Sequence, residues 1–199
     1  MRKLRVEGKA CNFELQTCTG FPNAVRRALL TDVSRYAPLE VEVVENTSSQ
    51  TDEYIAHRIG LIPFELTGDP EEKISLNVKG REVCAFDFEG DSFRAVENVP
   101  IILLSNIQEL KIRVSFTRGA GRDHARFALI GPVSYKMERA GEDGKQKKTC
   151  IGFETINNES PLTYLLDALL ELDAKIEAAR VFVEQSYDGK RRLLSEKKK

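Results

Sequence analysis

The sequence has no excess of charge of either sign. Its 30 lysine and arginine residues stand against 31 aspartate and glutamate residues, which leaves a net charge of −1 over 199 residues. A protein that holds nucleic acid by itself needs clustered positive charge to neutralise phosphates. We therefore expect this chain to meet DNA only indirectly, through partner proteins.

Long apolar runs are also missing. No stretch approaches the roughly twenty apolar residues of a membrane span, and the beginning, MRKLRVEGKACNFELQ, has no apolar run of about seven residues or more. These absences predict a soluble, intracellular protein that is neither secreted nor bound to a membrane. With 41% hydrophobic residues, the chain can still bury one good core or two small ones.

Cysteine and histidine are too few and too scattered for a metal centre. Cys11, Cys18, Cys84 and Cys150 form no close pair, which is typical of free thiols in a reducing compartment. A closed zinc site needs about four ligands, and the chain adds only two histidines to these cysteines. We predict no metal and no cofactor.

Residues 51–63, TDEYIAHRIGLIP, predict a short helix with a structural role. Thr51 is a suitable N-cap, with Asp52 as the alternative, and the Gly-Leu-Ile-Pro sequence ends the helix. Glu53 and His57 then lie one turn apart, where they can form a local ion pair or hydrogen bond. We interpret the charged and turn residues of this stretch as structural: Asp52, Glu53, His57, Arg58, Gly60 and Pro63.

A second acid–histidine pair, Asp123 and His124, resembles part of a catalytic triad. The chain contains no G-x-S-x-G motif, and no second histidine follows at the spacing of a zinc protease. We therefore interpret His124 as structural too. The alternative is a stand-alone enzyme that uses Glu53, His57, Asp123 and His124 as an acid/base cluster.

Alternating apolar and polar residues predict a mostly antiparallel sheet. Leu39, Val41 and Val43 alternate with two glutamates, and Leu110 to Phe116 follow the same period. An Asp-Gly pair at residues 143–144 suits a hairpin loop between the last two strands. The expected strands are 4–7, 12–17, 39–43, 74–78, 110–116, 128–137 and 150–155.

Two segments have helical periodicity instead. In residues 23–37, NAVRRALLTDVSRYA, the apolar side chains Val25, Leu29 and Val33 recur at helical spacing, and Arg26 and Arg27 fall on another face.

The second helix begins at Ser160, a suitable N-cap, with Pro161 at its first position. Its apolar residues approach a heptad seam, and we expect part of this seam to face another protein, the alternative being a helix packed wholly on its own sheet. The seam begins with Leu162, Leu165, Leu166, Leu169, Leu172 and Ile176 and runs on to Val183.

Four segments together resemble a known family. They are NAVRRALL at 23–30, APLEVEVVENTSSQTDEYIAHRIGLIPF at 37–64, GAGRDHARF at 119–127 and FETINNESPLTYLLDALLELDAKI at 153–176. In this order they resemble the alpha-like assembly subunit of multisubunit DNA-directed RNA polymerases. The closest resemblance is to the third subunit of eukaryotic RNA polymerase II and to the D-type subunit of archaeal polymerases, and the bacterial alpha amino-terminal domain is more distant.

The resemblance implies an α+β fold in two parts. Residues 1–41 and 114–199 would form a discontinuous dimerisation domain, in which an antiparallel sheet carries the two amphipathic helices. Residues 42–113 would form an inserted, mainly β domain.

The resemblance also implies a non-catalytic assembly platform for transcription. The chain would heterodimerise with a smaller alpha-like subunit through the apolar faces of both helices, and Arg26 and Arg27 would contact a large catalytic subunit. The heterodimer would then nucleate assembly of the largest and second-largest polymerase subunits. The alternative is a homodimeric scaffold without a promoter-binding domain of its own.

Two departures from the family pattern bear on the source. The metal-binding cysteines of some members are reduced here to Cys84 in the insert, and the usual G-x-x-x-x-H-A-K-W ends here with Arg126 and Phe127. Both suggest a trimmed member, archaeal or viral, located in the cytoplasm, the nucleus or a virion.

Overall fold

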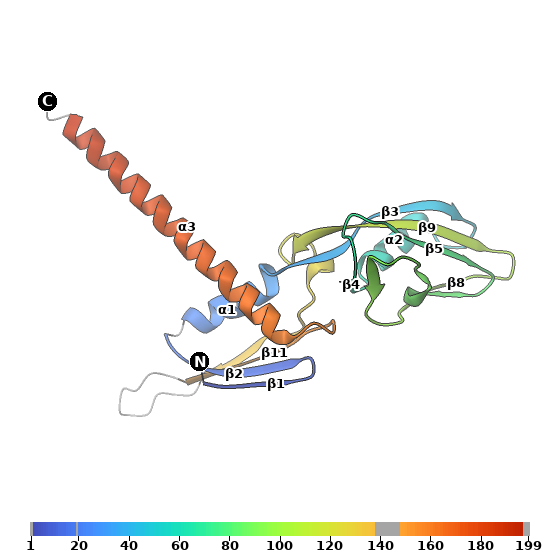
Figure 1. The fold of residues 1–199 in the computed structure, drawn as a ribbon, viewed down its shortest axis with the longest axis horizontal. Helices are drawn as coiled ribbons and strands as arrows, with labels where there is room; N and C mark the ends of the chain where they lie inside the picture. The colour runs from blue at the N-terminus through green and yellow to red at the C-terminus, as the bar shows by residue number, and fades with distance from the viewer. Residues whose placement is uncertain (1, 19, 138–147, 197–199) are drawn as a thin grey trace.

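The computed structural model describes residues 2–18, 20–137 and 148–196. It is an elongated α+β protein with antiparallel sheets and few helices, which confirms the predicted fold class. A sheet with two helices forms one end of the body, smaller sheets and a short helix form the other, and a long helix projects outward (Figure 1). None of the helices described is long and apolar enough to cross a membrane.

The first sheet has the strand order β1-β2-β11-β10, and all its pairings are antiparallel. Its strands are β1 (Arg2–Glu7), β2 (Ala10–Gln16), β10 (Ser134–Met137) and β11 (Lys148–Glu154). Alternate residues of β2 and β11 face α1 (Gly20–Thr31) and α3 (Pro161–Glu196). Together these elements bury one hydrophobic core, which includes Phe13, Val25, Leu29, Ile151, Phe153 and Tyr164.

A second hydrophobic core lies at the other end, between β3, β9, β5 and α2. The long strands β3 (Ser34–Asn46) and β9 (Glu109–Ala120) pair along nearly their whole length, and β5 (Ile74–Lys79) extends this sheet. Two small two-stranded sheets pair β4 (Phe64–Leu66) with β7 (Phe93–Ala95), and β6 (Glu82–Cys84) with β8 (Pro100–Leu103). The helix α2 spans Asp52–Gly60, and single 3-10 turns occupy Ala85–Asp87 (η1) and Ala125–Phe127 (η2).

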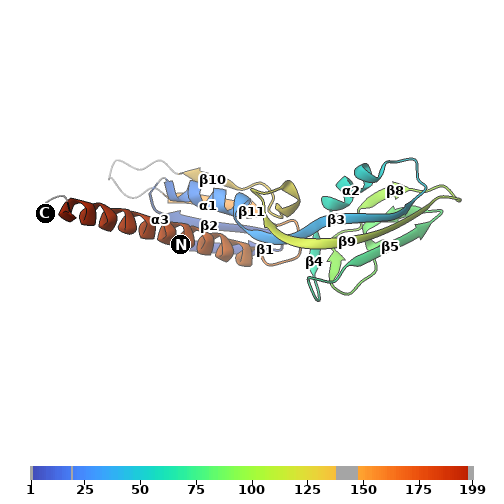
Figure 2. The same ribbon diagram turned by 90° about the horizontal axis from the view of Figure 1, so that it is seen from above.

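β3 and β9 run from the α1 end of the molecule toward its far end, so this two-stranded ribbon joins the two cores (Figure 2). We propose, from this arrangement, the domain division expected from the resemblance, with residues 42–113 as the inserted part.

The predicted first helix was too long, because α1 ends at Thr31 and β3 begins at Ser34. The backbone N–H of Arg122 donates to the carbonyl oxygen of Thr31 at 3.1 Å, where a continuing helix would have placed its own donor. Gly121 allows this close approach, since a Cβ there would clash with the carbonyl oxygen of Leu30. A neighbouring loop therefore caps the helix, and Val33 and Tyr36 lie beyond it.

The predicted strands agree with strands of the structure except near residue 128. Residues 128–133 are not a strand, and only Ile130 forms an isolated bridge, with Thr155. β10 and β11 pair as expected, although the predicted hairpin loop falls mostly at 138–147, outside the described residues.

Candidate subunit interface

The helix α3 begins as its sequence predicts. The hydroxyl of Ser160 accepts a hydrogen bond from the backbone N–H of Leu162 at 3.3 Å, and Pro161 occupies the first helical position. The first turns of the helix lie against the sheet, where Tyr164, Leu165 and Ala168 are at most 4% exposed. This end of α3 is therefore part of the core.

Beyond Leu172, the helix leaves the body of the protein. Every side chain described from Asp173 to Tyr187 is exposed, including Ile176 at 64%, Val183 at 63% and Tyr187 at 65%. Figure 1 shows this half of the helix projecting away from both sheets. Monomeric soluble proteins seldom expose such a series of large apolar side chains without a function.

These exposed residues continue the line that packs into the core. Leu165 and Leu172 are about two turns apart, and Val183 follows about three turns later, so all three lie on one side of the helix. Ile176 and Tyr187 lie close to the same line. We call Ile176, Val183 and Tyr187 the α3 stripe. A flanking row on the packed half of the helix is also exposed, and it consists of Leu162, Leu166 and Leu170.

The structure separates the predicted interface residues into two groups. Val25, Leu29, Val33 and Leu165 are at most 5% exposed and lie within the core of the chain itself. Periodicity identified these as one apolar face, but it could not show that the chain's own sheet covers that face. The remaining predicted positions are half-buried or exposed: Leu169, Leu172, Leu162, Leu166 and Ile176.

Arg26 and Arg27 differ in their surroundings. The guanidinium group of Arg26 donates to Asn23 Oδ1 at 2.9 and 3.2 Å and is half-buried. The side chain of Arg27 is exposed and makes no hydrogen bond or ion pair with the described residues. Of the two, only Arg27 is therefore free to reach another subunit without first losing a contact.

An ion pair between an exposed lysine and a buried aspartate braces α3 where it leaves the body. Asp32, 6% exposed, lies just after α1, and Lys175 Nζ is 2.6 Å from its Oδ2 atom. Arg122 approaches the other carboxylate oxygen at 3.7 Å. Lys175 follows the last half-buried leucine of α3 by less than one turn, so this contact fixes the direction in which the helix projects.

Polar contacts around α2 cap the helix and attach it to its neighbours. Thr51 caps the helix by accepting from the N–H of Tyr54 at 3.4 Å, and Asp52 accepts from the amide of Asn46 at 2.6 Å. Arg58 donates to the carbonyl oxygen of Pro100 at 2.7 Å, which ties α2 to β8.

The predicted local pair of Glu53 and His57 is wrong, because both side chains are exposed and no described contact joins them. α2 ends at Gly60, and Pro63 follows before β4, as expected.

His124 also has a structural role in this conformation. Its Nδ1 atom accepts from the backbone N–H of Arg126 at 3.1 Å, and Asp123 accepts from the N–H of Ala120 at 3.0 Å. Arg126 donates to the carbonyl oxygen of Pro38 at 2.6 Å, and its guanidinium group would lie 3.8 Å from a Cβ at Gly60. The motif thus joins η2, β3 and α2.

No described contact links Asp123 and His124 to Glu53 and His57, so the four do not form an acid/base cluster here.

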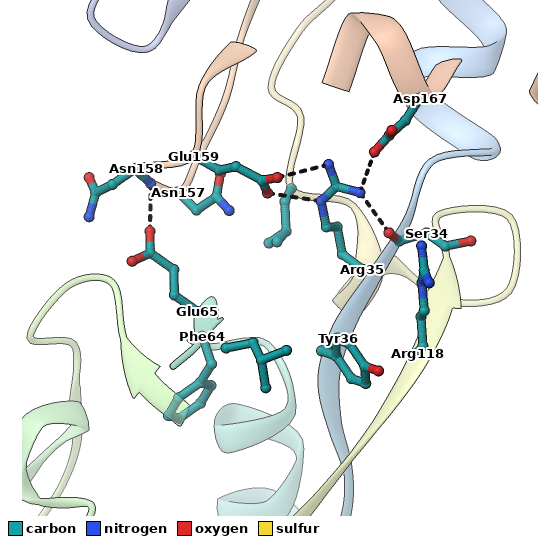
Figure 3. Close-up of a pocket in the computed structure, with 12 residues that line it drawn as sticks. Ser34, Arg35, Tyr36, Phe64, Glu65, Arg118, Asn157, Asn158, Glu159 and Asp167 are labelled. Atoms are coloured by element: carbon teal, nitrogen blue, oxygen red, sulfur yellow. Dashed lines mark hydrogen bonds and ion pairs between the residues drawn. The ribbon is translucent and has the colours of Figure 1, made fainter. Parts of the chain in front are cut away.

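A pocket that no sequence pattern predicts lies between the two cores. The pocket has a volume of about 590 Å³ (Figure 3). The guanidinium group of Arg35 lies at its edge and donates to Glu159 at 3.0 Å and to Asp167 at 2.9 Å, while it stacks 4.1 Å from the centre of the Tyr164 ring. We call this the junction pocket, and its polar and aromatic lining includes Arg35, Tyr36, Glu65, Asn157, Glu159 and Asp167. These residues come from distant parts of the sequence and follow no regular spacing.

The sequence is similar to archaeal polymerase subunits. It is 33% identical over 143 residues to DNA-directed RNA polymerase subunit Rpo3 of Methanocaldococcus jannaschii, which covers 68% of this chain and 73% of that protein. It is 35% identical over 138 residues to Rpo3 of Natronomonas pharaonis and 34% identical over 134 residues to Rpo3 of Thermococcus kodakarensis. The chain spans 56% and 50% of the length of these two relatives. No family model matches the sequence.

Proposed function

Because this chain belongs to the Rpo3 family of DNA-directed RNA polymerase subunits, we propose that it is a non-catalytic assembly platform of such a polymerase. It pairs with a smaller alpha-like subunit, and the resulting heterodimer nucleates assembly of the largest and second-largest subunits. DNA contacts the chain only indirectly, through the assembled complex.

The single observation that carries this proposal is the projecting half of α3. Its apolar stripe, Ile176, Val183 and Tyr187, is exposed although it continues the line of core leucines. A helix with such a stripe is stabilised when a second apolar surface covers it, by about 1.5 to 3 kcal/mol for each large side chain fully removed from water. The side chains of α3 that pack on the sheet need no partner, so the partner subunit belongs on the projecting half and on the exposed flanking leucines.

We assign Arg27 to the contact with a large subunit. It lies on α1 with its guanidinium group unbonded to any described residue, whereas the apolar face of the same helix is buried in the core. A guanidinium fork can hold a carboxylate or carbonyl oxygens in a fixed geometry. The platform therefore presents two separate surfaces, an apolar one on α3 for the small subunit and a basic one on α1 for a large subunit.

The test is co-expression with the smaller alpha-like subunit of the same source, followed by sedimentation analysis. Ile176→Asp places a charge on the α3 stripe and is expected to abolish the 1:1 complex, because a buried unpaired carboxylate is strongly unfavourable. Ala178→Asp is the matched control, since it adds the same charge to an exposed position on the opposite side of the same helix. A complex that survives Ile176→Asp as well as Ala178→Asp contradicts the interface.

The homodimeric scaffold is distinguished by the same measurement on the chain alone. A homodimeric scaffold predicts that the chain alone forms a stable dimer, that Ile176→Asp converts this dimer to monomer, and that the smaller alpha-like subunit does not displace the second copy. These results together would favour the homodimer over the heterodimer.

A further inference from the structure

The junction pocket has an excess of negative charge. Its wall contains three carboxylates, Glu65, Glu159 and Asp167, against the two guanidinium groups of Arg35 and Arg118. Figure 3 shows Glu65 and Glu159 on the side of the pocket opposite Arg118. Arg35 is already bonded to Glu159 and Asp167. Among the described residues, Glu65 accepts only a backbone N–H, that of Asn158 at 2.8 Å. Positively charged donors are therefore favoured over anions as ligands.

A second and independent observation points to a missing donor. Asn157 lines the pocket and is only 3% exposed, yet its side-chain oxygen has no hydrogen-bond partner within the described residues. Buried polar atoms in native proteins nearly always have a partner. A ligand that carries N–H groups into the pocket would supply the donor.

The other side of the pocket is aromatic and apolar. Tyr36 is half-buried and lines the pocket beside Phe64 and Leu129. An aromatic ring attracts a cation over its face and also packs against a methylene chain. The lining thus suits a ligand with an aliphatic stem and a cationic, hydrogen-bonding end.

We propose that the junction pocket binds an arginine side chain presented by another polypeptide. A planar guanidinium group has five N–H donors and a flexible methylene stem, which match the carboxylates, the free amide oxygen and the aromatic side. The chain's own Arg35 uses the same chemistry at the edge of the pocket, between two carboxylates and above a tyrosine ring. That the polypeptide is a further component of the polymerase rests on the proposed function, whereas the site itself does not.

The test is a titration of the isotope-labelled full chain with N-acetyl-arginine amide, followed by NMR. We expect saturable shifts of the Asn157 side-chain amide and of the Asn158 backbone amide. N-acetyl-citrulline amide has the same shape without the charge and is expected to bind about fivefold or more weakly. No saturable shift up to the solubility limit of the probe, or equal binding of the citrulline compound, overturns the proposal.

Variants locate the binding in the pocket. Glu65→Gln removes one charge but keeps an oxygen to accept from Asn158, and it should weaken the arginine probe about fivefold. Arg118→Gln removes a like charge and should strengthen binding. Glu71→Gln, a charge removed outside the pocket, is the matched control and should change nothing. If Glu65→Gln and Glu71→Gln behave alike, the site is not the junction pocket.

Two further results distinguish a protein side chain from a free ligand, and the pocket from the α3 surface. Spermidine that displaces the arginine probe with higher affinity would identify a free polyamine, and not a protein side chain, as the ligand. Glu65→Gln should leave the complex with the smaller alpha-like subunit intact, because no residue that lines the pocket lies beyond Asp167 in α3, whereas the α3 stripe begins at Ile176. The pocket proposal and the platform proposal can therefore fail independently.

Discussion

At the scale of single residues, two buried side chains with polar groups differ in whether those groups have a bonding partner. Asp32 has a charged partner within hydrogen-bond distance, whereas the hydroxyl group of Tyr164 has no partner among the described residues. Removing the charged partner of Asp32 should therefore destabilise the fold, whereas removing the hydroxyl group of Tyr164 should cost little near pH 7.

Lys175→Met is expected to destabilise the fold by about 1 to 3 kcal/mol, because it leaves the buried Asp32 carboxylate with the neutral Thr31 hydroxyl at 3.1 Å and the more distant Arg122 as its described side-chain contacts. Urea unfolding measures the change. Lys73→Met is the comparison, since Lys73 pairs with Glu42 at 3.9 Å with both side chains about half exposed, and such pairs contribute roughly 0 to 1 kcal/mol. Equal losses in the two variants would contradict the bracing role of Lys175.

Tyr164 provides a prediction at high pH. Burial raises the pKa of Tyr164 to about 12 from its usual value of about 10. A group whose pKa is higher in the folded state contributes its full stabilisation below the unfolded pKa and loses it as the pH rises toward the folded pKa. Between pH 10 and pH 12 the wild-type chain should therefore lose more unfolding free energy than Tyr164→Phe, by up to about 1.4 kcal/mol per pH unit. Near pH 7 the substitution should cost little, since the hydroxyl has no partner to lose. Parallel pH dependence of the two proteins would show that the hydroxyl titrates normally.

At the scale of elements, the end of α1 depends on a neighbouring loop. Gly121→Ala is expected to destabilise the protein by about 1 to 3 kcal/mol or more, because its Cβ would collide with the carbonyl oxygen of Leu30. Gly20→Ala is the matched control, since a Cβ at Gly20 meets nothing within 4 Å. Thermal unfolding of both variants makes the comparison, and a Gly121→Ala protein as stable as the control would show that the loop can move aside.

The helices show which parts of the fold could be predicted from the sequence alone. Caps and periodicity identified α2, most of the strands and the start of α3, because the hydrogen bonds and apolar spacing that define them lie within each segment. They extended α1 past Thr31, because the donor that ends it comes from Arg122, about ninety residues later. The candidate interface followed the same rule. Spacing found the apolar face of each helix, but only the folded chain shows that the face of α1 is covered and that of α3 is not.

At the scale of the whole molecule, folding and the proposed partner binding depend on different parts of α3. The last residue that packs on the core is Leu172, and the brace to Asp32 is completed at Lys175. A chain that stops after Lys175 is expected to unfold as cooperatively as the full chain, within about 1 kcal/mol, because it loses no residue of either core. It should nevertheless fail to bind the smaller alpha-like subunit. A truncated chain that still forms the 1:1 complex would move the interface onto the leucines that flank the packed half.

The projecting helix also bears on how a cell would control the amount of this protein. A chain without its partner displays Ile176, Val183 and Tyr187 to its surroundings, and these are the features that chaperones and proteases recognise in unassembled proteins. In the proposed heterodimer, the smaller alpha-like subunit would cover them. Copies made in excess would then be removed while paired copies persist, so the stripe that joins two subunits would also keep their numbers equal.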